Sequence, residues 1–253
     1  KPGSPNIMYV AGEGGIDYSN DAGLTWNAAN GSFILEGGVM MGVSPADPSV
    51  VYAIQASDDG GFHGLFKSTD SGVNFTLISD NSSGMNNILG YATDELGGQA
   101  PRDMDIIVSP VDIDQVHAGG IDTHKSTDGG ATWTQTSGWT FGGIFPFVHA
   151  DQDALYYITR NGEHRIYAAN DGGIYVSTDG ATTFTDLTPG MGIRDFYRMD
   201  VSETVADWVQ GGSQDNGTSV LRSDGIWYDW QGADGGSVLI DHSNHLNMWC
   251  TTN

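Results

Sequence analysis

The chain has 253 residues, of which 32 are acidic and 9 basic, and its formal net charge is −23 at pH 7. A surface this acidic repels nucleic acid and anionic membranes, so we expect neither as a partner. No apolar run reaches the 18 residues of a membrane-spanning helix, and the single cysteine, Cys250, excludes an internal disulfide. The 37 glycines are typical of many short strands joined by tight turns, and the length suits one large all-β domain.

Short β-rich runs recur along the chain in a fixed order. From the N-terminus, runs rich in Val, Ile, Tyr and Ala occupy residues 7–11, 50–54, 116–119, 166–169 and 208–211. A glycine turn and a further run follow, at residues 14–18, 64–67, 121–125 and 173–176. Apolar runs ending in Pro or Asp precede them, as at residues 41–48 and 107–112. Each unit therefore predicts four strands, and no stretch has the period of an amphipathic helix.

A turn motif with serine, aspartate and an aromatic residue returns about every 50 residues, the period of a four-stranded propeller blade. Its aspartate can accept hydrogen bonds from the backbone N–H groups just after it, and its glycine permits a left-handed backbone. The aromatic ring then opens the next strand and packs between sheets. We therefore predict a structural role for the motif. Its copies are Ser19, Asp21, Gly23 and Trp26; Ser68, Asp70, Gly72 and Phe75; Ser126, Asp128, Gly130 and Trp133; and Ser177, Asp179 and Phe184, with Ala181 in place of the glycine.

These repeats predict an all-β fold: a β-propeller of four-stranded antiparallel blades with about five blades in the chain. The chain opens and ends on equivalent strands of two blades, so we expect a portion of a larger propeller, a single domain over residues 1–253. Expected repeats cover residues 1–36, 37–88, 89–143, 144–193, 194–236 and 237–253, the last being the start of another blade.

At the repeated turns the chain resembles the BNR/Asp-box repeat proteins, which include sialidases, xyloglucanase-type glycoside hydrolases and sortilin-like receptor domains. Residues 125–133 and 211–218 resemble large surface proteins of gliding bacteria that are exported by type IX secretion. The resemblance implies a protein that is secreted or displayed at the cell surface. It also implies further domains in the same polypeptide. It implies no particular activity, because this fold supports enzymes and binding proteins alike.

The arginines argue against a sialidase. Such an enzyme holds its substrate's carboxylate with an arginine cluster and uses a Tyr nucleophile paired with a Glu. The chain has six scattered arginines and lacks the F/Y-R-I-P motif of sialidases; the nearest sequence begins at Arg165. Another glycoside hydrolase, closer to a xyloglucanase, needs only two carboxylates facing a cleft, and aspartates are plentiful.

Topology indicates where a functional site should lie. In an up-and-down blade, the aspartate turn shares its face with the first hairpin turn. The other face, here called the upper face, carries the second hairpin turn and the connections between blades, so it is free to bind a ligand. The long connection from Asp80 to Arg102 is expected there as a mobile loop, with solvated Asp94 and Glu95.

Three groups of upper-face residues are candidates. The first is the glycine-rich loop of Trp139 and Phe141, whose rings could stack on sugars or instead fill the space between blades. It leads to His149 and Asp151, which alternate on an expected inner strand and form either a metal or acid/base pair or a structural hydrogen bond.

The second group consists of acidic glycine turns whose oxygens suit Ca²⁺, although such pairs are also ordinary hairpin turns. The calcium candidates are Asp58, Asp59, Asp171, Asp215 and Asp234.

The third group pairs arginine with aromatic residues and could grip a ligand or form a surface ion pair. Its ligand-binding candidates are Arg194, Tyr197 and Trp230, and Asp215 of the second group is a further candidate.

The sequence thus favours an extracellular or cell-surface propeller module that binds a polysaccharide, other glycan or protein. No cofactor is required, calcium is a possible ligand, and no catalytic residue is assigned. The alternative is a glycoside hydrolase that uses two upper-face carboxylates.

Overall fold

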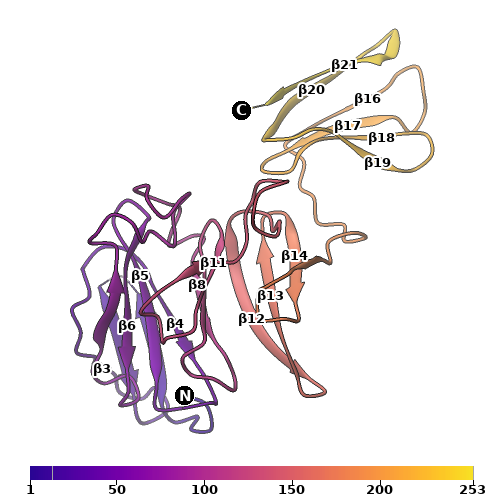
Figure 1. Cartoon of the computed structure of the whole chain (residues 1–253). Coiled ribbons are helices and arrows are strands. Elements are labelled where there is room, and N and C mark those ends of the chain that lie inside the picture. Colours follow the sequence, from indigo (N-terminus) through magenta and orange to yellow (C-terminus); the bar gives the residue numbers. More distant parts are fainter. Residues whose placement is uncertain (13, 253) are drawn as a thin grey trace. The chain divides into compact units, whose positions relative to one another are not determined.

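The computed structural model describes residues 1–12 and 14–252. Among these residues, β-strands are the only regular secondary structure. The chain divides into two compact units, Lys1–Thr188 and Pro189–Asn253, which are described separately. Figure 1 shows the chain coloured along its length. The described residues include no helix long and apolar enough to cross a membrane.

The first unit holds four antiparallel sheets, each a meander in which neighbours along the chain pair side by side. The prediction of an all-β fold with antiparallel, mostly four-stranded blades is confirmed. The strands are β1 (Met8–Gly12), β2 (Gly15–Ser19) and β3 (Asn27–Ala28) in the first sheet; β4 (Val39–Val43), β5 (Val51–Ala56), β6 (Phe62–Ser68) and β7 (Thr76–Asp80) in the second; β8 (Asp105–Val108), β9 (Val116–Gly119), β10 (Thr123–Ser126) and β11 (Thr134–Gln135) in the third; and β12 (Gln152–Arg160), β13 (Glu163–Asn170), β14 (Gly173–Ser177) and β15 (Thr185–Asp186) in the fourth.

The second unit holds one four-stranded and one two-stranded sheet, also antiparallel. Its strands are β16 (Arg198–Val201), β17 (Val209–Ser213), β18 (Gly217–Leu221) and β19 (Trp227–Gln231), followed by β20 (Gly235–Asp241) and β21 (Asn244–Thr252).

The hydrophobic core of the first unit lies between successive sheets. Tyr52 and Leu65, from the second sheet, belong to one buried cluster with Ile106 and Val116 of the third. The middle strand β5 is buried along its whole length because a sheet packs on each of its faces, which explains its unbroken apolar run. Blade-on-blade packing therefore replaces a single central core.

The four Ser-x-Asp turns close the lower end of these sheets and join the last two strands of each sheet. In the turn after β10, the buried Ser126 hydroxyl accepts the Gly130 N–H at 2.8 Å and donates to Asp128 Oδ1 at 2.8 Å. Asp128 in turn accepts the backbone N–H and the hydroxyl of Thr132 at 2.9 and 2.7 Å. The fourth copy carries Ala181 at φ 67°, a left-handed backbone that glycine adopts more readily.

The same turns contact the first hairpin turn of their own sheet. Ser71 N–H donates to the Ser49 carbonyl at 2.8 Å, and Gly129 N–H donates to the Asp114 carbonyl at 2.9 Å. The Ser-x-Asp turns and the first hairpin turns therefore share one face, and the upper face carries the remaining turns and the connections.

The connection between β7 and β8 is anchored rather than loose. Ile88 and Leu89 are fully buried in the cluster between the second and third sheets, and Asn87 is 1 % exposed. The prediction of a mobile loop was wrong here because two apolar residues inside a polar stretch fill the space between the blades. Asp94 and Glu95 are exposed, as solvated side chains should be.

Candidate functional site

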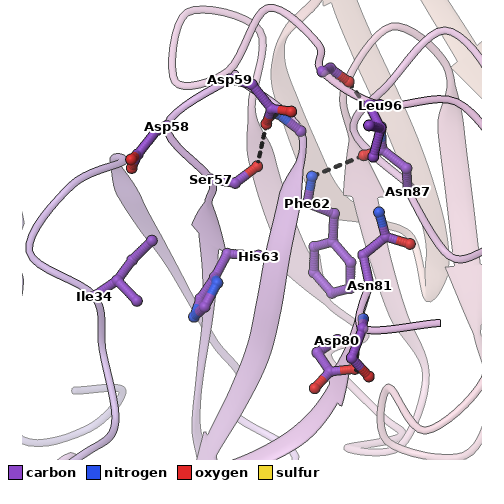
Figure 2. Close-up of a pocket in the computed structure, with 13 residues that line it drawn as sticks. Ile34, Ser57, Asp58, Asp59, Phe62, His63, Asp80, Asn81, Asn87 and Leu96 are labelled. Carbon is purple, nitrogen blue, oxygen red and sulfur yellow. Dashed lines mark hydrogen bonds between the residues drawn. The ribbon is translucent and has the colours of Figure 1, made fainter. Parts of the chain in front are cut away.

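A hollow of about 590 Å³ opens at the upper end of the second sheet, between the β5–β6 turn and the β7–β8 connection. Figure 2 shows His63 among the side chains that line the hollow, with Asp59 above it and Asp80 below it and to its right. Ile34 and Leu96 add apolar surface, whereas the lining residue Phe62 is only 2 % exposed. The volume lies within the ~300–1,000 Å³ of small-ligand sites.

The walls of the hollow approach each other closely. Gly60, at φ 81°, lies in the β5–β6 turn, and a Cβ placed on it would meet the Gly98 carbonyl oxygen at 2.5 Å. Asn87 ties the same walls together, since its side chain accepts the Phe62 N–H at 2.7 Å and donates to the Gly97 carbonyl at 2.7 Å. The hollow is thus formed by fixed backbone.

Two carboxylates of the hollow are held by their own turns. Asp59 Oδ1 accepts the Ser57 hydroxyl at 2.6 Å, and Asp80 Oδ1 accepts the Ser82 hydroxyl at 2.6 Å. These hydroxyl donors, together with backbone N–H groups, hold the pKa of both carboxyls below the ordinary value. Both are therefore anionic at neutral pH.

A further carboxyl pair lies at the rim of the hollow. The pKa of Glu36 is raised because its carboxyl hydrogen-bonds with that of Asp58 and two like charges are brought together. Asp58 lines the hollow, whereas Glu36 belongs to the β3–β4 connection beside it.

A second group of carboxyls surrounds Arg102, between the upper ends of the third and fourth sheets. The guanidinium donates to Asp103 Oδ1 at 2.5 Å and to both oxygens of Asp171, at 3.0 and 3.1 Å. Asp151 lies beside them and accepts the Gln99 amide at 3.0 Å. Arg102 thereby links the β7–β8 connection to the β13–β14 turn, and it supplies a positive charge to an otherwise acidic group.

Two carboxyls of this region have strongly raised pKa values. Burial, and then the charge of Asp151, raises the pKa of Asp103 to about 7, although Arg102 opposes the shift. Burial also raises the pKa of Asp122 to about 7. Both side chains are nearly inaccessible: Asp103 is 0 % and Asp122 is 4 % exposed. The groups best suited to proton transfer near neutral pH therefore have almost no contact with solvent.

The β11–β12 connection presents aromatic and apolar side chains to solvent. Trp139 is 48 % exposed, Phe141 83 % and Ile144 92 %, whereas the ring of Phe147 stacks on Phe141 with centroids 3.8 Å apart and packs on the core of the fourth sheet. Of the two alternatives for this loop, core filling therefore applies to Phe147, and Trp139 and Phe141 are available to a ligand.

His149 and Asp151 do not alternate on a strand, and that expectation was wrong. β12 begins only at Gln152, and Asp151 has a left-handed backbone at φ 67°. The backbone turns at this point because Asp151 N–H bonds the Ile121 carbonyl at 3.1 Å, which anchors the connection to the third sheet. Asp151 joins the group around Arg102 by this turn.

The candidates of the second unit have partners within that unit. Arg194 forms an ion pair with Asp229 at 2.9 Å and contacts Ser219, and the hydroxyl of Tyr197 bonds Gln214. Trp230 is 43 % exposed. The third group therefore includes a surface ion pair, one of the two alternatives, with an exposed ring nearby in the chain.

The calcium candidates differ in their surroundings. Asp58 and Asp59 line the hollow, whereas both oxygens of Asp171 accept hydrogen bonds from the Arg102 guanidinium, which competes with any metal. Asp234 Oδ1 accepts the Asp215 N–H at 2.8 Å, which links the β19–β20 connection to the β17–β18 turn. Calcium binding stays a prediction.

Sequence reasoning missed Arg102, Asp103, Asp122 and His63. One signal was available for the first two: Arg102 is one of few cations in a very acidic chain and directly precedes an aspartate at the start of an inner strand. For Asp122 and His63 no such signal exists, because their burial and their position beside the hollow depend on tertiary packing.

No family model and no curated protein matches the chain. Solved structures do. The GH74 enzyme of Niastella koreensis superposes with a TM-score of 0.52 at 20 % identity, over 98 % of this chain and 39 % of that one. The chain has the fold of a β-propeller. The GH74 xyloglucanase of Xanthomonas campestris (TM-score 0.51, 16 % identity, 98 % and 40 % covered) and an ancestral GH74 enzyme (0.50, 14 %, 96 % and 32 %) are similarly close. The chain thus spans about two fifths of the length of the first of these structures, and the likeness extends to the fold alone.

Proposed function

We propose that the chain is a propeller module, secreted or displayed at the cell surface, that binds a neutral polysaccharide on the upper face of its first unit. The three upper-face connections of this unit carry strongly exposed apolar and aromatic side chains, and the hollow with its carboxylates opens on the same face. This is the observation that supports the proposal. The side chains are Leu35, Met85, Tyr91, Leu96, Trp139, Phe141 and Ile144.

The combination suits a sugar polymer. Aromatic faces pack on the apolar faces of sugar rings, and carboxylate and amide oxygens accept hydrogen bonds from hydroxyl groups. The net charge of −23 disfavours a polyanion as the ligand. The similar GH74 structures, one of them a xyloglucanase, support a carbohydrate ligand for this fold.

The distribution of pKa values supports binding rather than hydrolysis. A glycosidase needs a carboxylic acid with a raised pKa in contact with the substrate. In the hollow, the pKa values of Asp59 and Asp80 are lowered, whereas the raised ones of Asp103 and Asp122 belong to buried groups.

One observation favours the alternative, a glycoside hydrolase. The exposed Glu36–Asp58 pair at the rim of the hollow combines a carboxyl of raised pKa with a second carboxylate. Hydrolysis of any glycan that is abolished by Glu36→Gln or Asp58→Asn would establish this alternative.

The test uses a glycan array, followed by affinity and hydrolysis measurements on every neutral oligosaccharide that binds. We expect binding without cleavage. The double variant Trp139→Ala/Phe141→Ala should weaken binding at least about tenfold, which is about 1.4 kcal/mol.

The matched control is Tyr156→Ala, which removes a 61 % exposed aromatic ring from β12 instead of a connection. It should leave the affinity unchanged. Absence of any neutral glycan among the ligands, or an affinity indifferent to Trp139 and Phe141, would overturn the proposal.

A further inference from the structure

Three of the four Ser-x-Asp turns pack on the sheet that precedes their own. Gly72 of the second turn lies against the first sheet, where a Cβ on it would meet the Tyr9 ring at 2.6 Å. A Cβ on Gly130 of the third turn would likewise collide with the Leu65 side chain of the second sheet. The fourth turn accepts a hydrogen bond from Lys125 of the third sheet at 3.0 Å. Each of these turns is therefore one half of a recurring contact between sheets.

The strands of the second sheet show which face makes this contact. Val51 and Ala53 of β5 belong to a buried cluster with Ile16 of the first sheet. Tyr52 lies between them in sequence, points the other way, and belongs to the cluster shared with the third sheet. The second sheet thus presents one face to the sheet before it and receives the next sheet on the other face.

The first sheet has an equivalent presenting face, and this face is exposed. Met8 of β1 pairs with the serine of its own turn, as Val51 of β5 does with Ser68. Met8 and Val10 are 42 % and 50 % exposed, and Trp26 of the first turn is 42 % exposed, whereas its counterpart in the second turn is 8 % exposed. We call Met8, Val10 and Trp26 the turn face.

The hairpin β20–β21 of the second unit exposes the opposite, receiving face. Ile240 is 1 % exposed, and Met248 beside it contacts the Trp208 indole of the neighbouring sheet. Leu239 and Trp249 pair across the hairpin, alternate with those residues along the strands and so lie on its other face. They are 51 % and 53 % exposed. We call this pair the hairpin face.

We propose that the turn face of one copy of this chain docks on the hairpin face of a second copy. The occupant is a second copy because the chain itself carries both halves of the contact that recurs between its sheets. Trp249 supplies a large ring on the receiving side, as Tyr9 does within the first unit, and Met8, Val10 and Trp26 supply the presenting side. The contact joins two different patches, so neither face pairs with itself.

Charge distinguishes this contact from one held by ion pairs. Copies that each carry a net charge of −23 repel one another at long range, and salt screens this repulsion. The apolar contact itself is not screened. Association should therefore strengthen as salt is added, and the few side chains involved place it among weak, concentration-dependent interfaces.

The experiment is sedimentation of the chain over a range of protein concentrations, in low and in high salt. We expect the weight-average mass to rise with concentration, and more steeply in high salt. Val10→Glu and Trp249→Glu should each weaken association at least about tenfold, because each places a charge in the apolar contact. The matched control Leu96→Glu makes the same kind of change at an 80 % exposed side chain outside both faces, so it should leave association unchanged.

Mixing the two variants tests the direction of the contact. Val10→Glu retains the hairpin face and Trp249→Glu retains the turn face, so an equimolar mixture should form a one-to-one complex although neither variant associates alone. Thermal unfolding verifies the folding of each variant. Val10→Thr, which keeps the branched shape, replaces Val10→Glu if the latter lowers the unfolding temperature.

A wild-type chain that stays monomeric at every concentration and salt would overturn the inference. So would association that survives both substitutions, or variants that fail to form the mixed complex. Glycan binding through Trp139 and Phe141 plays no part in these readouts, so the proposed function stands or falls separately.

Discussion

Aspartates at the two faces of the first unit have opposite properties. At the lower face, the turn aspartates Asp21, Asp70, Asp128 and Asp179 have pKa values lowered to about 2, in each case mainly by hydrogen bonds from the side chain and backbone of a residue four positions later. At the upper face, burial raises the pKa of Asp103 and Asp122 to about 7. The same side chain thus serves as a turn-closing acceptor in one place and as a buried acid in the other.

The difference follows from the available donors. A Ser-x-Asp turn supplies its aspartate with hydroxyl and N–H donors from neighbours in sequence, so the charge is stabilised locally. Asp103 and Asp122 are instead buried by packing, and in each of them one buried oxygen has no hydrogen-bond partner among the residues that the structure describes. The environment of the lower-face aspartates is therefore set by a few neighbours in sequence, whereas that of Asp103 and Asp122 is set by tertiary packing.

The largest effect is expected from the buried anchor of the β7–β8 connection. Leu89→Ala should lower the free energy of unfolding by about 2–5 kcal/mol, because it leaves a cavity between two sheets. Leu96→Ala, in the same connection, removes a side chain that is 80 % exposed and should cost less than about 0.5 kcal/mol. Urea unfolding measures both. A similar cost for the two variants would contradict the anchored connection.

The next effect concerns the serine of a lower-face turn. Ser126→Ala leaves the buried N–H of Gly130 without its acceptor and should cost about 1–3 kcal/mol. Ser82→Ala breaks an equally short hydroxyl bond to Asp80 at an exposed site and should cost less than about 0.5 kcal/mol. If the exposed pair proved as costly as the buried one, hydrogen bonding at the lower turns would not explain their recurrence.

The smallest effect is a pH dependence. The folded pKa of Asp122, about 7, lies above its unfolded value near 3.8, so ionisation favours the unfolded state. Its contribution is most favourable below pH 3.8 and is lost as pH rises through 7. Asp122→Asn lacks this term and can still accept the Gln135 amide, which bonds Asp122 Oδ2 at 2.9 Å.

The stability of the wild type relative to Asp122→Asn should therefore fall between pH 5 and pH 8, on the order of 1–2 kcal/mol. Thermal unfolding of the pair at the two pH values measures it. A difference that does not change with pH would mean that Asp122 is ionised throughout.

The fold was largely predictable because the information is local. Glycine turns, β-rich runs and the spacing of Asp21, Asp70, Asp128 and Asp179 indicated antiparallel four-stranded sheets without knowledge of their packing. Two predictions were wrong where tertiary packing determines the local structure. The polar residues around Ile88 and Leu89 suggested a mobile loop, and the alternation of His149 and Asp151 suggested a strand.

The candidate site was predicted less well for the same reason. Topology correctly indicated which face carries the connections, and Asp58 and Asp59 were named, although as calcium ligands. Asp80 becomes part of a hollow only because the connection after β7 returns past the β5–β6 turn. Contacts between residues so distant in sequence leave no pattern in a single sequence.

The division between a structural lower face and a ligand-binding upper face is tested most directly by one crossed measurement: unfolding temperature and affinity for a neutral glycan, for Ser126→Ala and for Trp139→Ala/Phe141→Ala. We predict that Ser126→Ala lowers the unfolding temperature and leaves the affinity unchanged, and that the aromatic double variant lowers the affinity and leaves the unfolding temperature unchanged. Loss of affinity in folded Ser126→Ala, together with full affinity in the aromatic variant, would contradict this division.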